Sequence, residues 1–282
     1  MFGPAYEETA DPIGSASGRM PGRSPMLLIA PALRRMPEPI IVIPARKAAE
    51  RLPGKPLLDI RGTPLVVHVW RRAREAGLGP VLVATDSPDI VRVIETAGGA
   101  AILTSHKHPS GSDRVFEAVS ATDPDARYDF VVNLQGDLPN IAPEALRAAL
   151  VPLADPAVDI ATLATRLADR RMSGDRNVVK VIGTAVGENR LKARCFTRAA
   201  IPDGEGDLLE HIGVYAFRRA ALERFAALPP SRLETRERLE QLRAIEAGMR
   251  IDVALVDDAP IGVDTPADLE RARTYFERKT KP

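Results

Sequence analysis

The sequence of residues 40–56 is IIVIPARKAAERLPGKP, and this stretch decides both the expected fold class and the expected location of the chemistry. Its first four residues are apolar and branched, which predicts a short strand buried on both faces, as in the middle of a parallel sheet. Residues 44–56 then carry four cations and three prolines around Gly54. Taken alone, this loop is either a solvated run of charge or a stiff clamp for phosphate groups.

Apolar runs and helical patterns alternate beyond this stretch. Strands are expected at residues 40–44, 81–86, 100–104 and 130–134, and helices at 64–76, 88–97, 112–120 and 142–153. Ser112 is the expected N-cap of the third helix. Strands rich in Val and Ile, separated by helices, predict a doubly wound α/β sheet with right-handed crossovers.

The pattern changes after residue 158. Strands are expected in close succession at 159–167, 177–182, 193–198 and 211–218, followed by a helix at 235–247, a strand at 251–255 and a helix at 266–277. We therefore expect one α/β domain over residues 39–279, with a mostly parallel but mixed sheet. A β-rich insertion at about 159–218 would cover part of that sheet or form a subunit contact.

The composition excludes several classes of protein. A net charge of +1 disfavours a general nucleic-acid or membrane-surface binder, and the single cysteine, Cys195, excludes internal disulfides and multi-cysteine metal sites. No apolar run is long enough for a membrane span. Residues 1–38 are rich in Pro, Gly and Ser and are expected to be a disordered extension or a non-native start, with a faint signal-peptide pattern as the alternative. The expected compartment is the cytoplasm.

Polar residues follow each of the first four expected strands. They are the basic loop, Asp86, the segment HKHPSGSDR at 106–114, and Gln135-Gly136-Asp137. Ligands of open parallel sheets bind beyond the carboxyl ends of the strands, near the point where strand order reverses. Pro53 and Pro56 stiffen the basic loop, so Arg46, Arg51 and Lys55 would be held ready for a triphosphate, as exposed loop cations.

Two carboxylates are candidate metal ligands. Asp137 ends a buried strand, where an unpaired carboxylate is costly unless it meets water or a cation. Asp264, in GVDTPADLE, lies between an apolar run and a helix start, and its alternative role is a helix cap. Carboxylates together with substrate phosphates are the usual environment of Mg²⁺. A structural role is expected for His68 and His211 when each is considered alone, and a buried position for Cys195 and Trp70.

Several segments together resemble one family. They are IPAR, RLPGKPL, VATD, SGSDR, NLQGD, NVVKV, TRAAIP, HIGVYAFR, LEQLR and GVDTPADLE, in this order between about Ile40 and Arg273. In that order the segments resemble the 3-deoxy-manno-octulosonate cytidylyltransferases, the CMP-Kdo synthetases of lipopolysaccharide biosynthesis. The resemblance implies a GT-A-like nucleotidyltransferase fold, a homodimer formed largely by the β-rich insertion, and dependence on Mg²⁺.

The resemblance also implies roles for individual residues. It assigns Arg46, Arg51 and Lys55 to the triphosphate, Ser110 and Arg114 to the cytidine, and Asp137 and Asp264 to the metal. It assigns the sugar-acid pocket to Gln135, Arg198, His211, Tyr215, Glu240 and Gln241. Lys55, Arg46, Asp137 and Asp264 would carry the catalysis, in which CTP and Kdo give CMP-Kdo and pyrophosphate.

Departures from the family pattern leave alternatives open. The family commonly has Gln-Gly-Asp-Glu-Pro, but Leu138 stands here in place of the glutamate and Asn140 follows Pro139; Ala49 stands where serine is usual. A related 2-keto sugar acid, such as 8-amino-Kdo, is the nearest alternative substrate. A non-catalytic CTP-binding protein is the alternative from another class.

Overall fold

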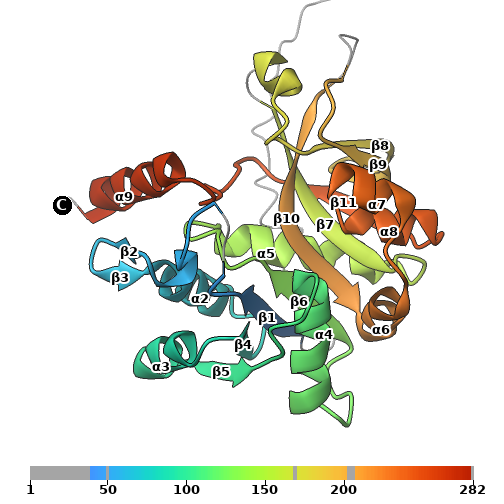
Figure 1. Ribbon diagram of the computed structural model, residues 1–282. Helices are drawn as coiled ribbons and strands as arrows, with labels where there is room; N and C mark the ends of the chain where they lie inside the picture. Colours follow the sequence, from blue (N-terminus) through green and yellow to red (C-terminus); the bar gives the residue numbers. More distant parts are fainter. Residues whose placement is uncertain (1–38, 49–50, 168–169, 202–206, 281–282) are drawn as a thin grey trace, which may run out of the picture.

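The computed structural model describes residues 39–48, 51–167, 170–201 and 207–280 (Figure 1). The extension expected at residues 1–38 and the departure at Ala49 lie outside this part. The described residues form a nine-stranded mixed sheet in the order β5-β4-β1-β6-β10-β7-β11-β9-β8, and a separate two-stranded ribbon. The mixed, largely doubly wound α/β fold class expected from the sequence is confirmed.

Four parallel strands make one half of the sheet: β1 (Ile40–Ala45), β4 (Val81–Thr85), β5 (Ala100–Leu103) and β6 (Phe130–Leu134). The chain moves outward from β1 to β4 and β5, then returns to β6 on the other side of β1. The order of strands therefore reverses between β1 and β6. The basic loop and Asp137 follow these two strands and consequently lie at the switch point.

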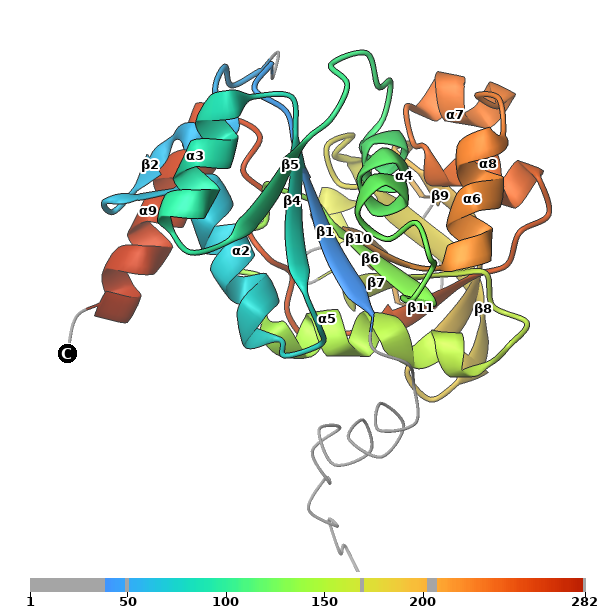
Figure 2. The ribbon, with the colours of Figure 1, turned by 90° about the horizontal axis from the view of Figure 1, so that it is seen from below.

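Helices cover both faces of this half, because successive residues of β1 point to opposite sides. Ile41 and Ile43 belong to one hydrophobic cluster and Ile40 and Val42 to the other. The first face carries α2 (Leu65–Glu75), α3 (Pro88–Thr96), α5 (Pro143–Leu150) and α9 (Pro266–Thr280). The second carries α4 (Gly111–Thr122), α6 (Arg219–Ala227) and α8 (Gln241–Glu246), as Figure 2 shows for α2 and α4 on either side of the strands.

The β-rich part extends the same sheet and does not form a layer over it. Its strands are β7 (Ile160–Arg166), β8 (Lys180–Gly187), β9 (Arg190–Thr197), β10 (Leu209–Arg218) and β11 (Ile251–Leu255). β10 runs antiparallel to both β6 and β7, and it also meets β8 at the pair Glu210–Lys180. β10 is therefore the strand that joins the parallel half to the β-rich half.

Several boundaries differ from those expected. Ser110, and not Ser112, caps α4, because its hydroxyl accepts from the backbone N–H of Asp113. The expected helix at 235–247 is two helices, α7 (Arg232–Glu237) and α8, separated by Arg238 in the left-handed region at φ 56°. β5 is an edge strand, with Leu103 54% exposed, so it is not buried on both faces.

Other elements were not anticipated from the sequence. These are α6 and the short pieces η1 (Lys55–Leu57), β2 (Asp59–Ile60), β3 (Thr63–Pro64) and η3 (Arg170–Gly174). η3 lies between two strands that were expected to have no helix between them. The helix expected at 142–153 is α5 followed by the short 3₁₀ helix η2 (Val151–Ala154). Among the helices of the described part, none has the length and apolar character that crossing a bilayer would require.

Candidate active site

A polar cleft lies beyond the carboxyl ends of β1 and β6. It consists of two adjoining cavities, of about 870 Å³ and about 580 Å³, which share Pro44, Arg46, Gln135, Asp137, Asn177, Arg198, Arg238 and Asp264. All the candidate residues line one or both cavities: Arg46, Arg51, Lys55, Ser110, Arg114, Gln135, Asp137, Arg198, His211, Tyr215, Glu240, Gln241 and Asp264. Segments far apart in the sequence therefore converge on one place.

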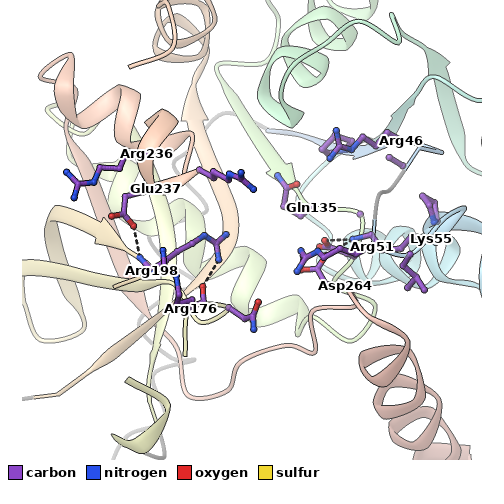
Figure 3. A pocket seen from close by; sticks show the side chains of 17 residues that line it. Arg46, Arg51, Lys55, Gln135, Arg176, Arg198, Arg236, Glu237 and Asp264 are labelled. Atoms are coloured by element: carbon purple, nitrogen blue, oxygen red, sulfur yellow. Dashed lines mark hydrogen bonds and ion pairs between the residues drawn. The ribbon is translucent and has the colours of Figure 1, made fainter. Parts of the chain in front are cut away.

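The cleft has two walls. We call the side formed by Arg46, Arg51, Lys55, Asp137 and Asp264 the loop wall. We call the side formed by Arg198, His211, Tyr215, Glu240 and Gln241 the strand wall. Figure 3 shows the larger cavity, with Arg46, Arg51, Lys55 and Asp264 on one side, Arg176, Arg198, Arg236 and Glu237 opposite, and Gln135 between them.

The basic loop is held by its own backbone. Gly54 has φ 67°, a conformation that glycine adopts without strain, and a Cβ there would meet nothing within 4 Å, so the constraint is on the backbone alone. The Gly54 N–H donates to Lys47 O at 3.3 Å, and the Lys55 N–H donates to Leu52 O at 3.1 Å. Pro56 is buried. The loop therefore presents its cations from a defined turn.

Lys55 bridges the two candidate metal ligands. Its ammonium donates to Asp137 Oδ2 at 2.9 Å and to Asp264 Oδ1 at 3.0 Å, and Arg51 Nη2 lies 3.0 Å from Asp264 Oδ2. Burial acts to lower the pKa of Lys55, but the two carboxylates outweigh it and the pKa is raised. Only 16% of the Lys55 side chain is exposed, so the expectation of an exposed loop cation is wrong for this residue.

The same geometry fits a magnesium ion. Two carboxylates from different segments already direct oxygens at one cation, the Lys55 ammonium. No group of three or more His, Cys, Asp or Glu side chains suited to a metal occurs in the described part of the chain. One or two carboxylates, completed by water and substrate phosphates, are the usual protein ligands of Mg²⁺. Asp137 and Asp264 therefore suit Mg²⁺ and do not resemble an all-protein metal cage.

Arg114 is placed to support the site from behind. It is only 3% exposed, and its guanidinium bonds Thr104 Oγ1 and pairs with Asp86 Oδ2 at 3.1 Å. Asp86 Oδ1 in turn accepts from the backbone N–H of Lys47 at 3.0 Å. These bonds tie together the segments that follow β1, β4 and β5. Asp86, noted from the sequence only as a turn, is the hub of this network.

The strand wall combines the buried Tyr215 and Gln241 with the half-buried Arg198, His211 and Glu240. His211 Nε2 lies 2.9 Å from Thr162 Oγ1, and its ring meets Phe196 edge-on at 5.0 Å between centroids. Burial, with a smaller effect of Arg198, lowers the pKa of His211 to about 3, so the imidazole is neutral at physiological pH. Burial also raises the pKa of Tyr215. His211 is therefore both hydrogen-bonded within the fold and part of the cavity lining.

A chain of hydrogen bonds connects the middle of the cleft to this wall. Gln135 Nε2 donates to Asn133 Oδ1 at 3.0 Å, Asn133 Nδ2 donates to Ser112 Oγ at 3.1 Å, and Ser112 Oγ donates to Glu240 Oε1 at 2.6 Å. Burial raises the pKa of Glu240, against the effect of hydrogen bonds from Ser112 and Ser110. Asn133 and Ser112, both fully buried, were not predicted as site residues, and Ser112 was expected only as a helix cap.

Gln241 has an unpaired group. Among the described residues, its Nε2 is the one buried side-chain nitrogen or oxygen without a hydrogen-bond partner. A buried donor left unpaired costs about 1–3 kcal/mol. Gln241 as a residue lines the smaller cavity.

Arginines gather near the strand wall. Arg198 donates from Nη1 to Arg176 O at 3.0 Å, and its backbone N–H donates to Glu237 Oε2 at 3.0 Å. The buried Lys180 donates to Arg198 O at 3.2 Å and supports the same turn. Arg176, Arg236 and Arg238 also line the larger cavity and were missed in the sequence, since nothing local distinguishes them from surface arginines.

Cys195, expected to be buried, is half-exposed.

Comparisons with known proteins agree on one family. A family model described as cytidylyltransferase matches residues 40–251. The 3-deoxy-manno-octulosonate cytidylyltransferase of Methylobacterium radiotolerans is 60% identical over 242 residues, which cover 86% of this chain and 98% of the relative. The protein of the same name from Azorhizobium caulinodans is 62% identical over 237 residues, covering 84% and 95%.

Solved structures extend the comparison. A structure of CMP:2-keto-3-deoxy-manno-octonic acid synthetase complexed with CTP superposes with a TM-score of 0.79 at 39% identity, over 86% of this chain and 99% of that one. UDP-glucose pyrophosphorylase complexed with UDP-glucose has a TM-score of 0.60 at 13% identity and shares the fold alone. Given the match over most of its length and the cleft just described, the chain belongs to the 3-deoxy-manno-octulosonate cytidylyltransferase family.

Proposed function

We propose that the chain catalyses the transfer of a cytidylyl group from CTP to Kdo, giving CMP-Kdo and pyrophosphate. One observation carries the proposal. Three features adjoin one another at the switch point of the sheet: a basic loop, two carboxylates that converge on a single cation position, and an arginine-bearing pocket. The reaction needs this combination, because it joins a triphosphate to a sugar acid.

The chemistry requires no covalent intermediate on the protein. The oxygen on the anomeric carbon C2 of Kdo forms a bond to the α-phosphorus of CTP and loses its proton to solvent. The bond between the α-phosphorus and the oxygen that bridges to the β-phosphate breaks, and pyrophosphate leaves with that electron pair. Catalysis of such transfers depends mainly on positioning and on stabilising charge that develops on phosphate oxygens.

The loop wall would stabilise the leaving group. Arg46 and Arg51 offer planar donors for phosphate oxygens, and the Lys55 ammonium supplies a compact positive charge. Among the described residues Arg46 has no side-chain ion pair, whereas Arg51 and Lys55 are engaged with Asp264 and Asp137. We therefore infer that Arg51 and Lys55 exchange carboxylate oxygens for phosphate oxygens when nucleotide binds.

Asp137 and Asp264 would hold Mg²⁺. When bound, the ion would neutralise charge on the α-phosphate and favour the ionised form of the attacking hydroxyl. The carboxylates themselves would keep the cation at the junction of the two cavities. Both Asp137 and Asp264 line both cavities, which supports this arrangement.

The strand wall would bind the sugar acid. Arg198 is the expected partner of its carboxylate, and Gln135, His211, Tyr215, Glu240 and Gln241 would bind its hydroxyl groups. His211 would act as a neutral hydrogen-bonding group and not as a cation, because its pKa is about 3. Ser110, at the start of α4, and the network of Arg114 would position the cytidine.

The setting of the reaction is also a proposal. A role in lipopolysaccharide biosynthesis in the cytoplasm is consistent with CTP as substrate. A homodimer is consistent with β8, an edge strand on which Ile182 is 45% exposed and Val186 is 43% exposed. Light scattering on the purified chain would give the mass, and a monomer at micromolar concentration would contradict the dimer.

The direct test is a pyrophosphate-release assay with CTP, Mg²⁺ and a panel of 2-keto sugar acids. The proposal expects turnover with Kdo well above that with 8-amino-Kdo or a sialic acid. Turnover of another acid, with none for Kdo, would overturn the substrate assignment. CTP binding without any pyrophosphate release would instead indicate a non-catalytic protein.

A further inference from the structure

The loops that carry Asp137 and Asp264 come from distant parts of the chain and are joined by two hydrogen bonds. The backbone N–H of Val263 donates to Asp137 O at 3.0 Å. The backbone N–H of Ile261 donates to the side-chain oxygen of Asn140 at 2.7 Å. The second bond is the only one of the two that depends on the identity of a side chain.

Asn140 lies in a tight turn directly after Asp137. The N–H of Ile141 donates to Leu138 O at 3.3 Å and closes the turn, and Asn140 is half-buried within it. Leu138 is only 7% exposed, and a Cβ on Gly262 would lie 4.0 Å from Leu138 Cδ2. The two residues noted above as departures from the family pattern thus both face the segment 261–263, one through apolar packing and one through a hydrogen bond.

Asp264 is held separately on its C-terminal side. Asp268 Oδ2 accepts from the backbone N–H of Asp264 at 3.1 Å, and from the N–H and hydroxyl of Thr265, each at 2.8 Å. These bonds fix the start of α9. On the N-terminal side, the bonds to Asp137 O and to Asn140 are what join the Asp264 segment to the Asp137 loop.

The Asp264 side chain is not held by packing, because 45% of it is exposed. Ion pairs with Lys55 and Arg51 hold this side chain here. Once those cations turn to phosphate, as proposed above, its position relative to Asp137 depends on where the backbone of residues 261–264 lies. The other residues of the site fix where the ligand lies. A small displacement of one ligand-binding group therefore weakens binding and slows catalysis. Groups that orient metal ligands without touching the metal change metal affinity by about 10–100-fold when they are removed.

We propose that Asn140 is a positioning residue that holds the Asp264 segment against the Asp137 loop and so sets the distance between the two carboxylates. This inference rests on the proposed function, in which those carboxylates hold Mg²⁺.

The test is a titration of Mn²⁺ binding to the purified full-length chain in the presence of CTP, followed by the electron paramagnetic resonance signal of free Mn²⁺. Asn140→Ala is expected to raise the Kd for Mn²⁺ about tenfold. The size-matched Asn140→Leu should do the same. Asn140→Asp keeps the acceptor oxygen and should stay close to the wild type. In turnover assays, both weakened variants should need more Mg²⁺ but recover most of kcat at saturation.

Asp159→Ala is the matched control. Asp159 Oδ2 accepts from the backbone N–H of Arg250 at 2.8 Å, the same kind of clamp, but at the opposite ends of β7 and β11 from the cleft. It should lower the melting temperature without changing the Kd for Mn²⁺.

Two results would overturn the inference. One is an unchanged Kd for Mn²⁺ in folded Asn140→Ala and Asn140→Leu. The other is an equal rise in Asp159→Ala, which would make the effect one of general stability. Absence of saturable Mn²⁺ binding in the wild type would overturn the metal site itself, and that outcome is distinguishable from both.

Discussion

The two walls of the cleft differ in the charge and in the burial of their side chains. The loop wall consists of charged groups, several of them exposed: the Arg51 side chain is 60% exposed and that of Asp264 45%. All of them except Arg46 are joined in ion pairs. The strand wall consists of buried and half-buried groups, and burial shifts the pKa values of His211 and Glu240. The loop wall suits a ligand that brings a large charge and a metal. The strand wall suits a ligand that must be distinguished by its hydroxyl groups.

The largest effect is expected on the loop wall, from Asp137→Ala. Removing one of the two carboxylates that receive the cation should lower kcat about a thousandfold or more, because charge stabilisation in the transition state is lost. The fold should persist, since the Asp137 bond to Val263 uses the backbone. The change in kcat is measured from the turnover of CTP and Kdo. The control is Asp258→Ala, which replaces an exposed aspartate. Near-normal turnover in Asp137→Ala would contradict the metal assignment.

A smaller loss of turnover, about a hundredfold, is expected for Lys55→Met. Because Lys55 separates two carboxylates, its removal should also leave Asp137 and Asp264 repelling one another. The melting temperature in EDTA should therefore fall by a few degrees. Mg²⁺ should raise the melting temperature of Lys55→Met more than that of the wild type. If Mg²⁺ shifts both proteins equally, Lys55 does not compete with the metal.

On the strand wall, His211 should make the fold sensitive to acid. Its pKa is about 3 in the folded chain, against about 6.5 when unfolded, so below pH 6.5 the unfolded state binds the extra proton. The free energy of unfolding should consequently fall as pH falls from 6.5, by up to about 1.4 kcal/mol per pH unit from this group. Urea unfolding between pH 7 and 4.5 should show a shallower decline in His211→Gln. Equal slopes would show that His211 titrates normally.

The smallest effect is expected from Ser112→Ala, which breaks the hydrogen-bond chain between Gln135 and Glu240. Ser112 makes two bonds of this chain, each worth about 0.5–1.5 kcal/mol, and their loss should raise KM for Kdo about tenfold and leave KM for CTP nearly unchanged. Ser120→Ala, on the same helix, is the control. A larger rise in KM for CTP than in KM for Kdo would contradict the assignment of this chain of bonds to the strand wall.

The loop wall was largely predictable from the sequence, and the reason is local. Buried strands such as Ile40–Ala45 are visible as runs of branched apolar residues, and in a doubly wound sheet the segments that follow them must meet. Pro53 and Gly54 signal a stiff turn. The pairing of the half-buried Lys55 with Asp264 was not predictable, because the two residues are more than 200 positions apart.

The strand wall was less accessible to such reasoning. Its candidates came from the family resemblance, since a lone histidine or tyrosine in an apolar strand has no distinctive pattern. The helix is interrupted at Arg238, but the sequence has no glycine or proline there. We therefore expected α7 and α8 to be one helix. The part that Asn133 and Ser112 play in the site was missed, because the role of a fully buried polar residue is visible only from its hydrogen-bond partners.

The most direct test of the central claim is a crystal structure with CTP and Mn²⁺, using the anomalous signal to locate the ion. We predict a peak between Asp137 and Asp264, with Lys55, Arg46 and Arg51 on the triphosphate. An ion located elsewhere, with the Lys55 ammonium still between the two carboxylates, would contradict this account of the loop wall.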